Sequence, residues 1–242
     1  MSTLYFTARL NGYRLINDLK IERGRGYYRQ ETIIAARKVA EAYGNPENYK
    51  LRKVTDLGRR MQEKYLKEAE NIGVGIDHRL RNQHSVKSKQ ELIDNLAEMA
   101  KTSNQLGSAC YNSEGLKEAQ ERYEEALKIN ENLRSAGHVN DIEWAEIQNN
   151  LGSICHAKGN SLKKEGYHQK AKEMFDQALE RYKQALSVFE KASTNVKTGT
   201  DVKVKVGRVF HHLGNVYRDL NNLPKAKESF VKALEGVCKL KN

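Results

Sequence analysis

The sequence predicts an all-α protein in which antiparallel helical hairpins stack side by side into a solenoid. Its 242 residues include only 2 prolines and 30% charged residues, a composition typical of helical proteins. The stretch from Phe210 to Ala233 carries apolar residues at helical spacing on two successive helices. Related patterns occur twice earlier in the chain, so repetition supports the fold class as well as composition.

The last hairpin shows the repeated pattern most clearly. Its first helix carries a large apolar residue, then a Leu-Gly pair and then an aromatic residue. Its second helix carries an aromatic residue with an alanine on each side of it along the same stripe. Asn221-Asn222 end the first helix, and Pro224 suits the first turn of the second. The two stripes consist of Phe210, Leu213, Gly214 and Tyr217, followed by Ala226, Phe230 and Ala233. This spacing resembles the tetratricopeptide repeat, and the resemblance implies a right-handed α-solenoid with an atypical helical cap at its N-terminal end.

Residues 1–88 are expected to form that helical cap or a degenerate repeat region. Apolar residues at helical spacing predict helices from Gln30 to Tyr43 and from Pro46 to Asn71. Residues 72–88 carry two glycines and no apolar stripe, so we expect a long loop there. Arg23–Arg29 mixes Arg, Gly and Tyr as RNA-binding segments do, but a glycine-permitted turn is the favoured interpretation.

Residues 89–242 are expected to form an array of about three repeats, at 89–133, 140–193 and 202–238. The Leu-Gly pairs are farther apart than the usual period of about 34 residues, so the helices should be long. Alanines and aromatics alternate from Ala171 to Ala192, which predicts one helix from about Gly166 to Ala192. The middle repeat is similar to those of kinesin light chain. Val202–Val209 should begin the first helix of the last repeat.

Charge, hydropathy and cysteine content indicate the kind of partner and the cellular compartment to expect. The formal net charge is +11, with basic residues concentrated towards both ends of the chain, which could attract acidic proteins or nucleic acid. No apolar run is long enough to span a membrane, and we expect a cytoplasmic protein. Cys110 and Cys155 should be free thiols in the packing face. No spacing of Cys and His fits zinc, so we expect no metal and no cofactor.

The repeat register predicts which side chains line a concave groove along the first helices. Asparagines recur there, and an amide both donates and accepts, which suits the backbone of an extended peptide. Basic residues add attraction for an acidic peptide or a free carboxylate. The predicted groove residues are Lys101, Asn104, Gln105, Ser108, Glu146, Asn149, Asn150, Ser153, Arg208, His211, His212, Asn215 and Arg218. The ordinary polar surface of a helix is the alternative.

The sequence favours a non-catalytic scaffold or adaptor that binds a peptide or helix of a partner protein. His211 and His212 are adjacent on a helix and cannot chelate one metal together, although His156 could approach either one across the groove. Nucleic-acid binding, above all to RNA, through the basic N-terminal and groove residues is the alternative function. The last repeat carries no polar capping helix, so self-association through Phe230, Val231 and Leu234 is a further expectation.

Overall fold

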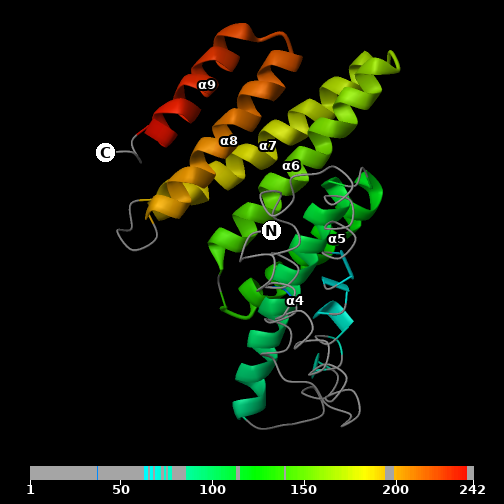
Figure 1. Cartoon of the computed structure of the whole chain (residues 1–242), viewed down its shortest axis with the longest axis vertical. Helices are drawn as coiled ribbons and strands as arrows, with labels where there is room; N and C mark the ends of the chain where they lie inside the picture. Colours follow the sequence, from blue (N-terminus) through cyan, green and yellow to red (C-terminus); the bar gives the residue numbers. More distant parts are fainter. Residues whose placement is uncertain are drawn as a thin grey trace, which may run out of the picture. The chain divides into compact units, whose positions relative to one another are not determined.

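A computed structural model describes residues 86–112, 115–138, 140–193 and 199–238, together with Arg37 and parts of 63–77. Every regular element in these ranges is an α-helix (Figure 1). The prediction of an all-α fold is therefore confirmed. Contacts divide the chain into two compact units, Met1–Val139 and Asn140–Asn242, and each unit is described by itself.

The first unit contains the hairpin of α4 (Val86–Asn112) and α5 (Leu116–Ser135). This hairpin covers the range 89–133 predicted for the first repeat and extends by a few residues beyond each end. The loop predicted at 72–88 is wrong in its described part, because Val74, Ile76 and Asp77 are helical and α4 already begins at Val86. Ile76 is only 3% exposed, and such packing overrides the low helix propensity of the neighbouring glycines. The other predictions for residues 1–62 lie outside the described residues, except at Arg37, which is helical.

The second unit contains α6 (Asp141–Lys164), α7 (His168–Ser193), α8 (Gly199–Asp219) and α9 (Leu223–Cys238). These helices lie side by side in chain order, and each packs on the next (Figure 1). The long helix predicted near 166–192 and the helix predicted from Val202 are both confirmed as α7 and α8.

The ends of these helices follow from local chemistry. Asn140 caps α6, because its side-chain oxygen accepts a hydrogen bond from the Glu143 N–H at 3.2 Å. Gly166 has φ +85°, a backbone conformation that glycine adopts without a steric penalty, and it lets the chain turn from α6 into α7. Asn221 ends α8 with φ 58°, and Asn222 then accepts from the Lys225 N–H at 3.3 Å.

One contact recurs inside each hairpin: a glycine of the first helix lies against an aromatic ring of the second. A Cβ added to the glycine would lie 2.6–2.7 Å from the ring, so only glycine permits this approach. Tyr182 of α7 is 1% exposed in this position. The pairs are Gly107 with Tyr123, Gly152 with Tyr182, and Gly214 with Phe230.

The extended middle hairpin contains a further contact of the same kind, between Gly159 and Phe175. This contact lies nearer the α6–α7 turn than the one between Gly152 and Tyr182. The alternating residues of α7 are buried along almost the whole helix, namely Ala171, Phe175, Ala178, Tyr182, Ala185 and Phe189. The added length of this repeat therefore packs inside its own hairpin.

Candidate functional site

The predicted groove residues of α4 are engaged within the first unit. Asn104 is buried, and Arg37 donates from Nε to the side-chain oxygen of Gln105 at 3.1 Å. Lys101 lies 3.2 Å from Glu98, which also pairs with Arg37. These side chains contribute to the packing of the first unit and belong to a different unit from the other predicted groove residues.

Tyr123 donates its hydroxyl to Ser108 Oγ at 3.1 Å, so the last predicted residue of α4 is also engaged. The same contact occurs in the second unit, where the Tyr182 hydroxyl donates to Ser153 Oγ at 3.1 Å. In both hairpins the serine directly follows the glycine that the tyrosine ring covers.

In the second unit, three contacts between side chains join α6 to α8, and Lys163 Nζ also donates to the backbone carbonyl of Asp219 at 2.7 Å. Lys205 Nζ lies 2.6 Å from Glu146 Oε1. His212 Nδ1 lies 3.1 Å from Asn149 Oδ1. Nearer the end of both helices, His156 Nε2 lies 2.7 Å from Asp219 Oδ2. The predicted residues Glu146, Asn149 and His212 therefore hold two helices together.

His212 is held neutral by its surroundings. Burial, together with the smaller effects of the nearby His211, Arg208 and His156, lowers the pKa of its imidazole to about 4. A neutral imidazole carries one N–H, and an amide oxygen only accepts, so Nδ1 carries the proton that Asn149 binds. The ring also lies 5.3 Å from the Tyr182 ring.

The predicted residues that remain accessible lie on the face that α6 and α8 share, which we call the α6/α8 face. Asn150 and Ser153 of α6 and Asn215 of α8 are half-buried, while Arg218 is exposed. Asn150 accepts from the Asn149 amide at 3.4 Å, and Asn215 donates to His211 Nδ1 at 3.4 Å. This face presents amides and a guanidinium, which bind backbone groups or carboxylates, whereas the Ser153 hydroxyl already accepts from Tyr182 and donates to the Asn149 carbonyl.

The pairing of His156 with Asp219 was not predicted from the sequence, which suggested His211 or His212 as its neighbours. Asp219 follows Asn215 by one helical turn and so lies on the same face, which is the signal that could have identified it. The pair is an imidazole and a carboxylate without a third ligand. Within the described ranges, no group of three or more His, Cys, Asp or Glu side chains could hold a metal ion.

Cys110 and Cys155 are thiols and not part of a disulfide, as predicted. Cys110 is buried and Cys155 is half-buried. Burial raises the pKa of the Cys110 thiol to about 11, and nearby carboxylates act in the same direction. Burial also raises the pKa of the Cys155 thiol. Neither thiol is therefore activated as a nucleophile.

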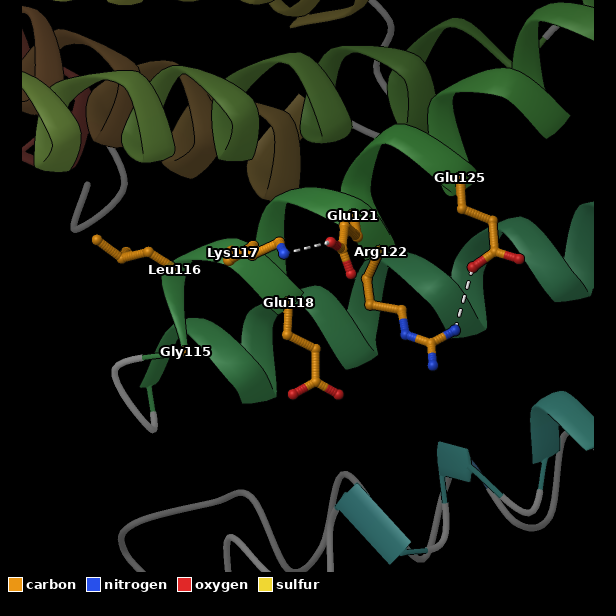
Figure 2. Close-up of a pocket in the computed structure, with 7 residues that line it drawn as sticks. All are labelled: Gly115, Leu116, Lys117, Glu118, Glu121, Arg122 and Glu125. Carbon is orange, nitrogen blue, oxygen red and sulfur yellow. Dashed lines mark hydrogen bonds and ion pairs between the residues drawn. The ribbon is translucent and has the colours of Figure 1, made fainter.

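A hollow of about 950 Å³ lies beside the first turns of α5, as Figure 2 shows. Its charged side chains pair with one another: Arg122 lies 3.2 Å from Glu125, and Lys117 lies 4.0 Å from Glu121. Arg122 also pairs with Glu70, and Lys67 lies 3.6 Å from Glu118. The lining is thus a set of ion pairs between neighbouring side chains, and nothing in it points to a ligand.

A second hollow, of about 500 Å³, lies between α8 and α9, and we call it the α8/α9 hollow. Its lining is apolar apart from two of the predicted groove residues, Arg208 and His211. The structure therefore brings these two side chains to the outer side of the last hairpin. The lining residues are Val204, Gly207, Arg208, His211, Phe230, Ala233 and Leu234.

Comparison with known families agrees with this architecture. The family profile described as Tetratricopeptide repeat matches residues 152–184 and 207–235. The first matched stretch contains the glycine–aromatic contacts of Gly152 with Tyr182 and of Gly159 with Phe175, and the second contains that of Gly214 with Phe230. These two stretches are therefore tetratricopeptide repeats, and for them the resemblance inferred from the sequence is confirmed. Repeats of this family generally mediate protein–protein interactions and are typically non-catalytic.

Two solved structures are similar to the chain at low identity. The "Crystal structure of BtubC (BKLC) from P. vanneervenii" is 15% identical, with a TM-score of 0.38, and the match covers 100% of this chain and 94% of that one. A protein from "Computational Design of Self-Assembling Cyclic Protein Homooligomers" is 12% identical, with a TM-score of 0.32, over 98% and 95% of the two chains. No curated protein matches the chain in sequence. None of the described helices is long and apolar enough to cross a membrane.

Proposed function

We propose that this protein is a non-catalytic interaction scaffold that holds an extended or acidic peptide, or a helix, of a partner protein along the α6/α8 face. Tetratricopeptide repeats generally bind proteins, and residues 152–184 and 207–235 carry two of them. Stacked repeats create extended concave surfaces of this kind. The single observation that carries the proposal is the set of polar side chains on this face that remain accessible.

Those accessible side chains are Asn150, Asn215 and Arg218. They lie beside the three contacts that already join α6 to α8, so the helices that position them are fixed to each other. A fixed row of amides binds a peptide backbone at a lower entropic cost than a mobile row would. Arg218 supplies the charge that favours an acidic segment or a carboxylate.

Asn149 takes a different part in this arrangement. It is 7% exposed, and its side-chain oxygen accepts from His212. Replacing it by alanine would leave the His212 N–H without this partner, at a cost of about 1–3 kcal/mol in stability. Because this loss of stability would accompany any loss of binding, Asn149 is unsuitable as a probe of binding.

The test uses Asn150→Ala with Asn215→Ala in the full-length chain, and pull-down from a lysate of the source organism with quantitative mass spectrometry. We expect the affinity for specific partners to fall about thirtyfold and their recovery to fall with it, because two hydrogen bonds contribute about 1 kcal/mol each. Gln177→Ala, an exposed amide on α7, is the matched control and should retain them. Equal recovery with both variants would rule out this face as the binding site.

RNA binding remains the alternative function. The N-terminal segment that suggested RNA binding, Arg23–Arg29, lies outside the described residues. Among the predicted groove residues, the exposed Arg208 and Arg218 would contribute positive charge. A gel shift with single-stranded RNA that weakens steeply with salt would favour this alternative. A cytoplasmic setting is part of the proposal, and the free thiols Cys110 and Cys155 support it.

A further inference from the structure

The α8/α9 hollow lies away from the polar contacts between α6 and α8, on the other side of the last hairpin. Large apolar side chains at its rim are exposed: Leu234 is 66% exposed and Val204 is 40% exposed. Phe230 lies at its base, with its ring 5.8 Å from His211. An apolar depression with such a rim is characteristic of interaction sites.

The same chain contains a covered version of this depression. The contact of Gly152 with Tyr182 in the α6/α7 hairpin corresponds to that of Gly214 with Phe230 in the α8/α9 hairpin. Counting from these contacts, every lining residue of the hollow has a counterpart in the α6/α7 hairpin. The apolar counterparts are Ile142, Ala145, Tyr182, Ala185 and Leu186, and all belong to or pack against the core cluster.

Helix α8 is what covers the counterpart face. Its aliphatic side chains join the same core cluster, and they recur at positions i, i+4, i+7 and i+11 of the helix. Such spacing places them on one stripe. These four residues are Val202, Val206, Val209 and Leu213.

Charge distinguishes the two faces. On the covered face, Glu146 of α6 pairs with Lys205 of α8 at 2.6 Å. Lys205 lies three residues after Val202, the first residue of the aliphatic stripe, and so occupies position i+3 of the helix. In the α8/α9 hairpin the counterpart of Glu146 is Arg208, an exposed residue of the hollow. The position opposite the covering helix has therefore changed from acidic to basic.

We propose that the α8/α9 hollow is a second docking site, which binds an amphipathic helix of a partner protein. That helix carries aliphatic side chains at i, i+4, i+7 and i+11, which fill the apolar hollow as α8 fills its counterpart. It carries Asp or Glu at i+3, opposite Arg208. Recognition of such a helix in an apolar groove relies on anchors at these spacings.

A second copy of this chain fits less well. Its α8 would bring Lys205 against Arg208, and two like charges at that position repel. The exposed apolar surface also consists of only a few side chains, whereas a stable dimer usually buries about 800 Å² on each partner. A single helix needs less surface than a dimer does.

The test uses two fluorescent 21-residue peptides, one with the sequence of α8 and one with Lys205→Glu, titrated against the full-length chain. We expect the Lys205→Glu peptide to bind roughly fivefold more tightly, because an attractive exposed pair replaces a repulsive one. Against the chain with Arg208→Glu, the preference should reverse in favour of the unchanged peptide. The reversal depends on the charge opposite i+3 and not on the general stickiness of the peptides.

Leu234→Asp should abolish binding of both peptides, whereas Leu223→Asp should leave it unchanged. Leu223 is also on α9 and is 60% exposed, but it does not line the hollow. Absence of binding by either peptide, equal binding of the two, or retention of binding by Leu234→Asp would overturn the proposal. So would a concentration-dependent dimer in light scattering that Leu234→Asp abolishes, because the occupant would then be a second copy.

Discussion

Acidification from pH 7 to pH 5 should destabilise the second unit through His212. In the folded chain burial lowers the pKa of this imidazole to about 4, whereas an unfolded histidine titrates near 6.5. Between these values the unfolded state binds the proton more readily. The stabilisation is therefore fully present above about pH 6.5 and is lost as the pH falls towards 4.

The size of the effect follows from these two pKa values. The whole difference corresponds to about 3 kcal/mol, and about 2 kcal/mol of it is lost by pH 5. Other groups also titrate in this range, so the contribution of His212 must be isolated with a variant. His212→Gln removes the titration and keeps an N–H that can donate to Asn149 Oδ1.

The assay is urea unfolding at pH 7 and pH 5, followed by tryptophan fluorescence. The chain has 1 tryptophan, Trp144, which lies on α6 and packs against the core cluster of the second unit, so its signal reports on that unit. We expect the native chain to lose about 2 kcal/mol more than His212→Gln between the two pH values. His168→Gln, an exposed histidine on α7, should behave as the native chain does. Equal losses for the native chain and His212→Gln would refute the reasoning.

Two further predictions concern packing. Gly214→Ala should lower the stability of the second unit by about 1–2 kcal/mol, because its Cβ would lie 2.6 Å from the Phe230 ring, and this clash outweighs the better helix propensity of alanine; an unchanged or raised urea midpoint would contradict it. Cys110 should be alkylated at pH 8 at least a hundredfold more slowly, on the order of its reduced thiolate fraction, in the folded chain than in urea, because burial raises the pKa of its thiol to about 11. Peptide mapping by mass spectrometry measures both rates, and comparable rates would show that the thiol is not buried in solution.

The helices of the array were largely predictable because their determinants are local in sequence. The spacing of a Leu-Gly pair on one helix and an aromatic ring on the next identifies a hairpin, as in Gly214 and Phe230. The length of α7 was readable from the alternation of alanine and aromatic residues. The helical residues within the predicted loop at 72–88 were not predictable, because Ile76 is buried although no apolar stripe at helical spacing marks this segment.

The candidate site was predictable only to the level of a helix face. The repeat register places Asn149 and Asn150 on the first helix of a repeat, but it does not reveal that Asn149 accepts from His212 while Asn150 remains more accessible. That difference depends on how α8 lies against α6. For the same reason the pairing of His156 with Asp219 became evident only in three dimensions.

The two tyrosine–serine hydrogen bonds have a consequence for how the array opens. In the α4/α5 and α6/α7 hairpins, the aromatic ring that covers the glycine is a tyrosine, Tyr123 or Tyr182. The hydroxyl of each tyrosine donates a hydrogen bond to a serine of the facing helix. The α8/α9 hairpin has Phe230 in that place, and Asn215 follows its glycine. Its ring is therefore held by packing alone, beside a hollow that no described helix covers. Local unfolding starts where few buried contacts must be broken, so the last hairpin is where the second unit begins to separate, and a helix bound in the hollow would close that route.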